Sequence, residues 1–243
     1  MKTLTRILPC FALASVCGLL FVAPSVNAAS IVLNGGFEAN IDNTGPFATA
    51  PLTNWTVGEV LGVPATPNQN RVDGLDPTLL YALAPHTGRI AAAFNSTTNT
   101  VVTGGVATLT QGLATTAQTY DLSFWLANPI QDASNFHNIF SVSWNGILQA
   151  LSSPFLTEVG ITKTYRVTPQ TTWFQVNVNN LLATGAVTNL QFSGRNSDWA
   201  TLLDDVSAQA SGVPDSGGTI AFLGLALAGL VLFSRKAQRA DLA

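Results

Sequence analysis

Hydrophobic and polar residues alternate along much of the middle of the chain. From Tyr120 to Ala127, large apolar side chains occupy the even positions, and the runs at 173–178 and 189–193 repeat this alternation. Successive side chains of a β-strand point to opposite faces of a sheet, so this period of two indicates strands with one buried face. Across residues 29–212, no stretch keeps the 3.6-residue period of a helix for three turns.

Turn signals separate these runs. Residues 140–144 alternate in the same way, and Asn145-Gly146 then leads into an apolar run from Ile147 to Leu151. An Asn-Gly pair between two such runs is the strongest short-range signal of a β-hairpin. Many short strands of this kind predict an all-β fold, an antiparallel jelly-roll β-sandwich over residues 29–212. The proline-rich segment from Thr49 to Leu80 is expected to form long loops.

Residues 1–28 have the order of a secretory signal peptide. Lys2 and Arg6 precede an apolar run, and Val26 and Ala28 then occupy the −3 and −1 positions of a cleavage site. Cleavage is expected after Ala28, so the protein should leave the cytoplasm. The alternative is a retained membrane anchor.

A second apolar segment lies near the C-terminus. The run from Thr219 to Phe233 is uninterrupted and reaches a marginal length for a ~30 Å hydrocarbon layer once its uncharged flanks are included. The basic tail, residues 235–243, follows at once and should stay on the cytoplasmic side. We therefore expect a transmembrane helix at 218–234, with a buried core helix as the alternative.

A short motif precedes this helix: Val213, Pro214, Asp215, Ser216 and Gly217. Motif, helix and basic tail in this order resemble the PEP-CTERM class of bacterial sorting signals, in its VPDSG variant. The resemblance implies recognition by an exosortase, a membrane-embedded cysteine protease-transpeptidase, and cleavage near the motif. Proline lacks an N–H donor and disfavours helix at the preceding residue, which keeps such a site extended. The sorting signal is thus expected to span 213–243.

Composition narrows the function classes. Only 9% of the residues are charged against roughly 25% in ordinary soluble domains, and the net charge of −3 offers no basic footprint for nucleic acid. Both cysteines, Cys10 and Cys17, lie in the predicted signal peptide. Disulfides, thiolate zinc sites and cysteine nucleophiles are therefore excluded from the mature chain.

Several short motifs within residues 31–208 carry a second resemblance. They are Asn34–Glu38 followed by Trp55, His86–Gly88 followed by Ala91–Phe94, Leu109–Leu113, Tyr120–Trp125, and Leu203–Ser207. In this order they are similar to galactose-binding-like carbohydrate-binding modules, and in detail to exported PEP-CTERM proteins with a DUF642-like domain. The resemblance implies a jelly-roll fold and an association with extracellular polysaccharide.

The same resemblance implies a structural calcium ion held by Glu38 together with Asp204 or Asp205. Pairing of the first and last strands would bring these acids to one edge of the sandwich. Calcium takes six to eight oxygen ligands, which two or three carboxylates and backbone carbonyls supply. The alternative is that Glu38 caps a turn and the two aspartates are solvated residues at a strand end.

Two tryptophans are candidates for a binding face. Trp125 and Trp173 are out of phase with their apolar neighbours, so each points away from the layer that those neighbours fill. Flat aromatic rings stack on sugars beside a few hydrogen-bonding groups, and Gln175 and Asn177 share the predicted face of Trp173. The alternative is that both rings cover a second apolar layer.

Catalytic patterns are weak. The close acid pairs are Asp73 with Asp76 and Asp204 with Asp205, and no Gly-x-Ser-x-Gly or His-Glu-x-x-His motif is present. His86 and His137 are expected to be loop or hydrogen-bonding residues. We predict no enzymatic activity, and a glycan-active hydrolase ranks last among the functions considered.

Together these features predict an exported, non-catalytic protein of the cell surface or extracellular matrix that associates with polysaccharide. Its domain should lie outside the inner membrane until an exosortase processes the C-terminus. The alternative is a structural or adhesive matrix protein without a defined ligand.

Overall fold

The structure is a computed structural model that describes residues 29–40, 52–60, 70–78, 82–96, 105–129, 138–195 and 200–211. The predicted signal peptide, the sorting signal from Val213 onward, His137 and Trp199 lie outside these ranges. Within them, no helix has both the length and the apolar character needed to cross a membrane.

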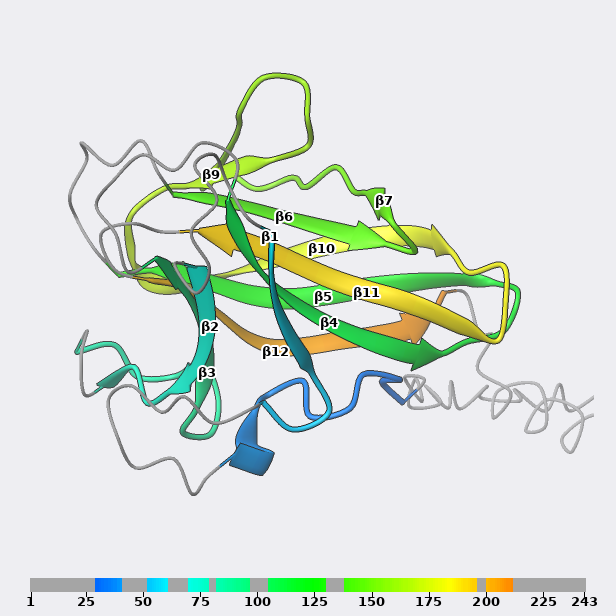
Figure 1. Cartoon of the computed structure of the whole chain (residues 1–243), viewed down its shortest axis with the longest axis horizontal. Coiled ribbons are helices and arrows are strands. Elements are labelled where there is room, and N and C mark those ends of the chain that lie inside the picture. Colours follow the sequence, from blue (N-terminus) through cyan, green and yellow to red (C-terminus); the bar gives the residue numbers. More distant parts are fainter. Residues whose placement is uncertain are drawn as a thin grey trace, which may run out of the picture. The chain divides into compact units, whose positions relative to one another are not determined.

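Two antiparallel sheets form the described part of the chain (Figure 1). The five-stranded sheet has the order β10 (Gln170–Leu182), β5 (Thr119–Asn128), β12 (Ala200–Ala210), β3 (Ala91–Ser96) and β2 (Asn70–Leu75). The seven-stranded sheet has the order β1 (Thr56–Val60), β4 (Val106–Ala114), β11 (Val187–Arg195), β6 (Ile139–Trp144), β9 (Tyr165–Val167) and β8 (Leu156–Glu158), with β7 (Ile147–Leu148) paired to β6. A single 3₁₀ turn, η1 (Glu38–Asn40), precedes β1.

The connections between the sheets explain the architecture. The long strands β4, β5 and β6, and later β10, β11 and β12, alternate between the two sheets along the sequence. This alternation is the connectivity of a jelly roll, and it stacks the sheets face to face. The prediction of an all-β antiparallel sandwich is confirmed.

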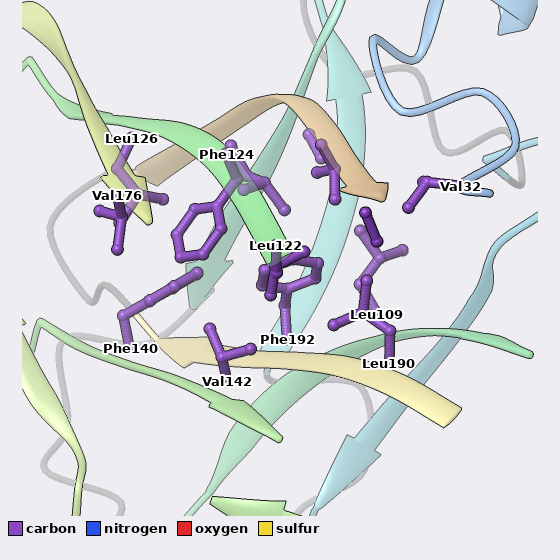
Figure 2. Packing of buried hydrophobic residues seen from close by; sticks show 14 of the residues in the cluster. Val32, Leu109, Leu122, Phe124, Leu126, Phe140, Val142, Val176, Leu190 and Phe192 are labelled. Carbon is purple, nitrogen blue, oxygen red and sulfur yellow. The ribbon is translucent and has the colours of Figure 1, made fainter. Parts of the chain in front are cut away.

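Side chains from both sheets fill the space between them (Figure 2). Phe124 of the five-stranded sheet packs edge-on against Phe192 of the seven-stranded sheet, with ring centroids 5.2 Å apart. Phe94 meets Phe140 in the same way at 5.6 Å. All four rings are fully buried.

The predicted hairpin is present. β6 and β7 pair across Asn145 and Gly146, whose φ angles of 52° and 79° are those of the tight turn that favours this dipeptide. The second strand is shorter than the apolar run from 147 to 151, because only Ile147 and Leu148 join the sheet.

The expectation of long loops from residue 49 to residue 80 is wrong in part. This segment contains β1 and β2, which lie at the edges of the seven-stranded and five-stranded sheets. The prolines at 51, 64, 67 and 77 all fall outside the two strands. Prolines between the strands limit the length of β1 and β2 without preventing their pairing. Each is an edge strand that pairs on one side only, so its hydrophobic alternation in the sequence is weak.

Candidate functional site

The predicted site residues meet on the outer face of the five-stranded sheet. The strand register places Asp204 of β12 beside Trp125 of β5, and Trp125 beside Gln175 of β10. The loop of residues 82–90, which lies between β2 and β3, hydrogen-bonds to side chains of β12 and β10 on this face. We call it the cover loop.

Asp204 binds the backbone of the cover loop. Its side chain has no solvent exposure, and its Oδ2 accepts hydrogen bonds from the N–H groups of His86 at 3.0 Å and Thr87 at 3.3 Å. Its Oδ1 accepts a third from the N–H of Asp205 at 2.7 Å. Burial, and then the neighbouring Asp205 carboxylate, raise the pKa of Asp204 to about 8.

Asp205 binds the side chains of the same loop. Its Oδ2 lies 2.6 Å from His86 Nδ1, and its Oδ1 accepts a hydrogen bond from Thr87 Oγ1 at 2.6 Å. Adjacent residues of a regular strand point to opposite faces, but the register of β12 shifts between Asp204 and Ser207, and Asp205 has a φ of 46°. The bulge therefore turns both carboxylates toward one loop.

Glu38 holds the other end of the cover loop. Its Oε1 accepts hydrogen bonds from the backbone N–H groups of Arg89 and Ile90, both at 2.8 Å. Gly88 has a φ of 60°, and a Cβ at this position would lie 2.3 Å from the Glu38 carboxyl group. Only glycine fits here, and Glu38 caps the turn, as in the alternative considered above.

The three acids converge through the cover loop. β12 pairs with β3 only as far as Leu203, and the segment before Glu38 hydrogen-bonds to the next part of β12: the N–H of Val206 donates to the carbonyl of Gly35 at 3.0 Å, and the N–H of Ile31 donates to the carbonyl of Ala208 at 2.9 Å. The first described segment therefore pairs with the last strand where the aspartates lie. In the part of the chain that the structure describes, no three His, Cys, Asp or Glu side chains are arranged to hold one metal ion. The carboxylate oxygens that calcium would take as ligands accept hydrogen bonds from N–H and O–H groups of the cover loop. Calcium binding by these residues stays a prediction.

Aromatic rings complete the contact between loop and sheet. The imidazole of His86 stacks on the indole of Trp125, with centroids 3.7 Å apart and planes 17° from parallel. Trp173 meets the edge of the same imidazole at 6.2 Å, and its Nε1 donates a hydrogen bond to the carbonyl of Ala84 at 2.7 Å. Histidine thus lies between the two tryptophans.

Trp173 also covers a second, small apolar cluster on this face. Trp173 and Leu83 of the cover loop are half-buried against it, and its buried members are Leu75, Ala93, Ala127, Ala200 and Leu202. These contacts give Trp173 the packing role considered as an alternative. Its direct contact with a ligand stays a prediction.

The outer face continues beyond the cover loop as a row of polar side chains, which we call the polar strip. Gln175 and Asn177 of β10 are exposed, and the register pairs Asn177 with Ser123 of β5 and Ser123 with Ser207 of β12. The strip adjoins Trp125, whose indole is half-buried under His86. Amide and hydroxyl groups beside an aromatic ring form a surface able to hydrogen-bond to sugar hydroxyls.

The imidazole–carboxylate pair invites comparison with a catalytic triad, in which a hydroxyl group hydrogen-bonds to the imidazole. Here the hydroxyl of Thr87 and the imidazole of His86 both bind Asp205. The hydroxyl of Thr87 therefore donates to the carboxylate and not to the imidazole, unlike the hydroxyl of a triad. Sequence reasoning predicted a hydrogen-bonding role for His86 but missed Thr87, and the His-Thr-Gly triplet was the available signal.

Comparison with known proteins identifies the C-terminal signal. Residues 212–237 match the model of the VPDSG-CTERM motif, which confirms the resemblance to that class of sorting signals. Among curated proteins, none matches the chain in sequence.

Several solved structures are similar in fold. TmCBM61 in complex with beta-1,4-galactotriose is 16% identical, with a TM-score of 0.43, and the match covers 75% of this chain and 99% of that one. The CBM22-1 xylan-binding domain of Paenibacillus barcinonensis Xyn10C is 10% identical, with a TM-score of 0.43 and coverages of 76% and 96%. A Stig cyclase, Fisc from Fischerella sp. TAU, is 15% identical, with a TM-score of 0.48 and coverages of 75% and 97%.

Proposed function

We propose that this chain is an exported, non-catalytic surface protein that is sorted through its C-terminal signal and binds polysaccharide through the polar strip. The VPDSG-CTERM match at residues 212–237 supports the sorting, including membrane anchoring by residues 218–234 and processing by an exosortase. The predicted signal peptide supports export across the inner membrane to the cell surface or extracellular matrix.

The observation that carries the binding proposal is the polar strip beside Trp125. Gln175, Asn177, Ser123 and Ser207 present amide and hydroxyl groups from three neighbouring strands. Such groups donate to and accept from sugar hydroxyls, and an extended row suits a chain of sugars better than a single one. Two of these side chains, Gln175 and Asn177, are exposed.

The hydrogen bonds of three acidic side chains support a non-catalytic role. Asp204, Asp205 and Glu38 each accept hydrogen bonds from the cover loop. A glycosidase needs one carboxyl group to protonate the leaving oxygen and a second to act as base or nucleophile. Acids that hold a loop in place are not positioned for that chemistry.

The test compares two matched pairs of substitutions. Gln175→Ala with Asn177→Ala removes both exposed amides from the polar strip. Asn189→Ala with Gln191→Ala removes the same two residue types, also two apart on one strand, from the outer face of the seven-stranded sheet. Binding is measured by glycan array and by affinity electrophoresis in gels containing bacterial exopolysaccharide.

We expect the first pair to lose about tenfold in affinity, equivalent to about 1.4 kcal/mol, and the second pair to bind like the wild type. Equal glycan binding by both double variants would show that the polar strip is not the binding surface. Failure of the wild-type protein to bind any glycan would favour the structural matrix role. Release of reducing sugar from a bound polysaccharide would instead establish an enzyme.

A further inference from the structure

The chain leaves the sandwich at one end, which is also where two turns come together (Figure 1). The N–H of Ser211, which follows β12, donates to the carbonyl of Thr119 at 2.8 Å, and Thr119 pairs with Leu182 at the end of β10. The N–H of Thr115 donates to the carbonyl of Ala186 at 3.0 Å. We call this region, made of the turns 114–119 and 182–187 with Ser211, the exit end.

The exit end exposes large apolar side chains, and its two turns contain no charged side chain. Leu182 is 60% exposed and Val187 is 65% exposed. The other residues of the two turns are Ala, Thr, Gly and Gln, and Ser211 is also uncharged. At the opposite end of the sandwich, the strand termini carry Glu59 and Arg195. A surface that approaches lipid must avoid the cost of dehydrating charged groups, and of these two ends of the described sandwich the exit end meets that condition better.

The length of chain beyond Ser211 limits how far the exit end can lie from a membrane. Six residues, 212–217, separate Ser211 from the predicted transmembrane helix at 218–234. Fully extended, they reach about 20 Å, at about 3.3–3.6 Å per residue. Leu182 lies two strands away from the end of β12, or about 10 Å. An anchored chain would therefore hold the exit end near the bilayer.

We propose that the exit end rests on the lipid surface while the chain is anchored, with Leu182 and Val187 inserted among the lipid headgroups. This inference rests on the anchoring step of the proposed function. The partner is the bilayer itself, because the tether ends in a segment that resembles a membrane span. In this orientation the polar strip, on the outer face of the five-stranded sheet, stays available to polysaccharide.

The test uses the full exported chain, which has no cysteine of its own because Cys10 and Cys17 precede residue 29. Single variants Leu182→Cys, Val187→Cys and Ile161→Cys are labelled with a fluorophore and reconstituted into phosphatidylcholine–phosphatidylglycerol vesicles that contain doxyl-labelled lipid. Ile161 is the matched control, because it is 98% exposed in the β8–β9 loop, which lies away from the exit end (Figure 1). Flotation after an alkaline wash reports anchoring independently of the label.

We expect the labels at 182 and 187 to be quenched about threefold more than the label at 161, since interfacial side chains lie about 5–10 Å into the headgroup boundary. Flotation with equal quenching at all three positions would overturn this inference and leave the anchor intact. Failure to float would overturn the anchor itself. Energy transfer between copies labelled at 182, without lipid quenching, would replace the bilayer by a second copy of the chain.

Discussion

The outer faces of the two sheets differ in how they use their polar residues. On the five-stranded sheet, Asp204 and Asp205 hold the cover loop, and Trp125 and Trp173 pack beneath it. On the seven-stranded sheet, two rows of residues are paired in register across β6, β11 and β4. The first row is Ser141, Ser193 and Thr108, and the second is Ser143, Gln191 and Thr110. Neither row contains an acidic or an aromatic side chain. The difference shows that the acids and aromatic rings on the outer face of the five-stranded sheet hold the cover loop against that sheet.

The largest effect that would test this contrast is expected at Asp204. Asp204→Ala leaves the N–H groups of His86, Thr87 and Asp205 without their acceptor at a position that has no solvent exposure. Each unsatisfied buried group costs about 1–3 kcal/mol, so the free energy of unfolding should fall by about 3 kcal/mol or more. Urea denaturation measures the change.

Ser193→Ala on the seven-stranded sheet is the matched control and should change the free energy of unfolding by less than about 0.5 kcal/mol. A small loss at Asp204 would mean that the cover loop is not part of the cooperative fold.

Trp173 provides the next largest test. Trp173→Ala exposes the small cluster around Leu202 and removes the hydrogen bond to Ala84, so a loss of about 2 kcal/mol is expected, below the ~3–5 kcal/mol of a fully buried tryptophan. Trp173→Phe keeps most of the packing and should lose about 1 kcal/mol with the indole N–H. A Trp173→Ala variant that keeps its stability but fails to bind glycan would restore Trp173 as a ligand contact.

The pH dependence of stability gives a third test. The pKa of Asp204 is raised from its ordinary value of 3.8 to about 8, so the folded state holds a proton that the unfolded state releases. The contribution of this group is therefore complete below about pH 4 and is lost as the pH rises toward 8, by up to about 1.4 kcal/mol per unit.

Urea denaturation between pH 5 and pH 8 should show this decline in the wild type, and Asp204→Asn, which cannot titrate, should show a flatter profile. Parallel profiles for the two proteins would contradict a raised pKa at Asp204.

The smallest effect is expected from chelation. Because the carboxylates of Glu38, Asp204 and Asp205 already hold the cover loop through hydrogen bonds, EDTA should lower the melting temperature less than any of the substitutions above. Calcium at one hundred times its dissociation constant would add about 2.7 kcal/mol if it bound the folded state. A rise in melting temperature on adding calcium, absent in Glu38→Gln, would establish the predicted metal site.

The sequence predicted the regions where a local pattern decides the structure. Alternation at 120–127 and the Asn145-Gly146 pair are local, and they led to β5 and to the β6–β7 hairpin. The edge strands β1 and β2 were missed because they are short and lie among prolines. The sequence named Glu38, Asp204, Asp205, Trp125 and Trp173 as candidates, but it did not predict how the cover loop connects them. β12 has a bulge at Asp205, and its acids hold the cover loop from more than one hundred residues away. Both features depend on tertiary contacts, which no local pattern in the sequence encodes.

The position of β12 has a consequence for how the domain would fold during the proposed export. β12 is the last strand in the sequence, yet it lies between β5 and β3 in the five-stranded sheet. Its acids also fasten the cover loop across 117–119 positions of chain. Contacts of such long range are slow to form, and this sheet has no central strand until residue 210 has been translocated. We therefore expect the domain to cross the membrane unfolded and to fold only when its sorting signal reaches the bilayer.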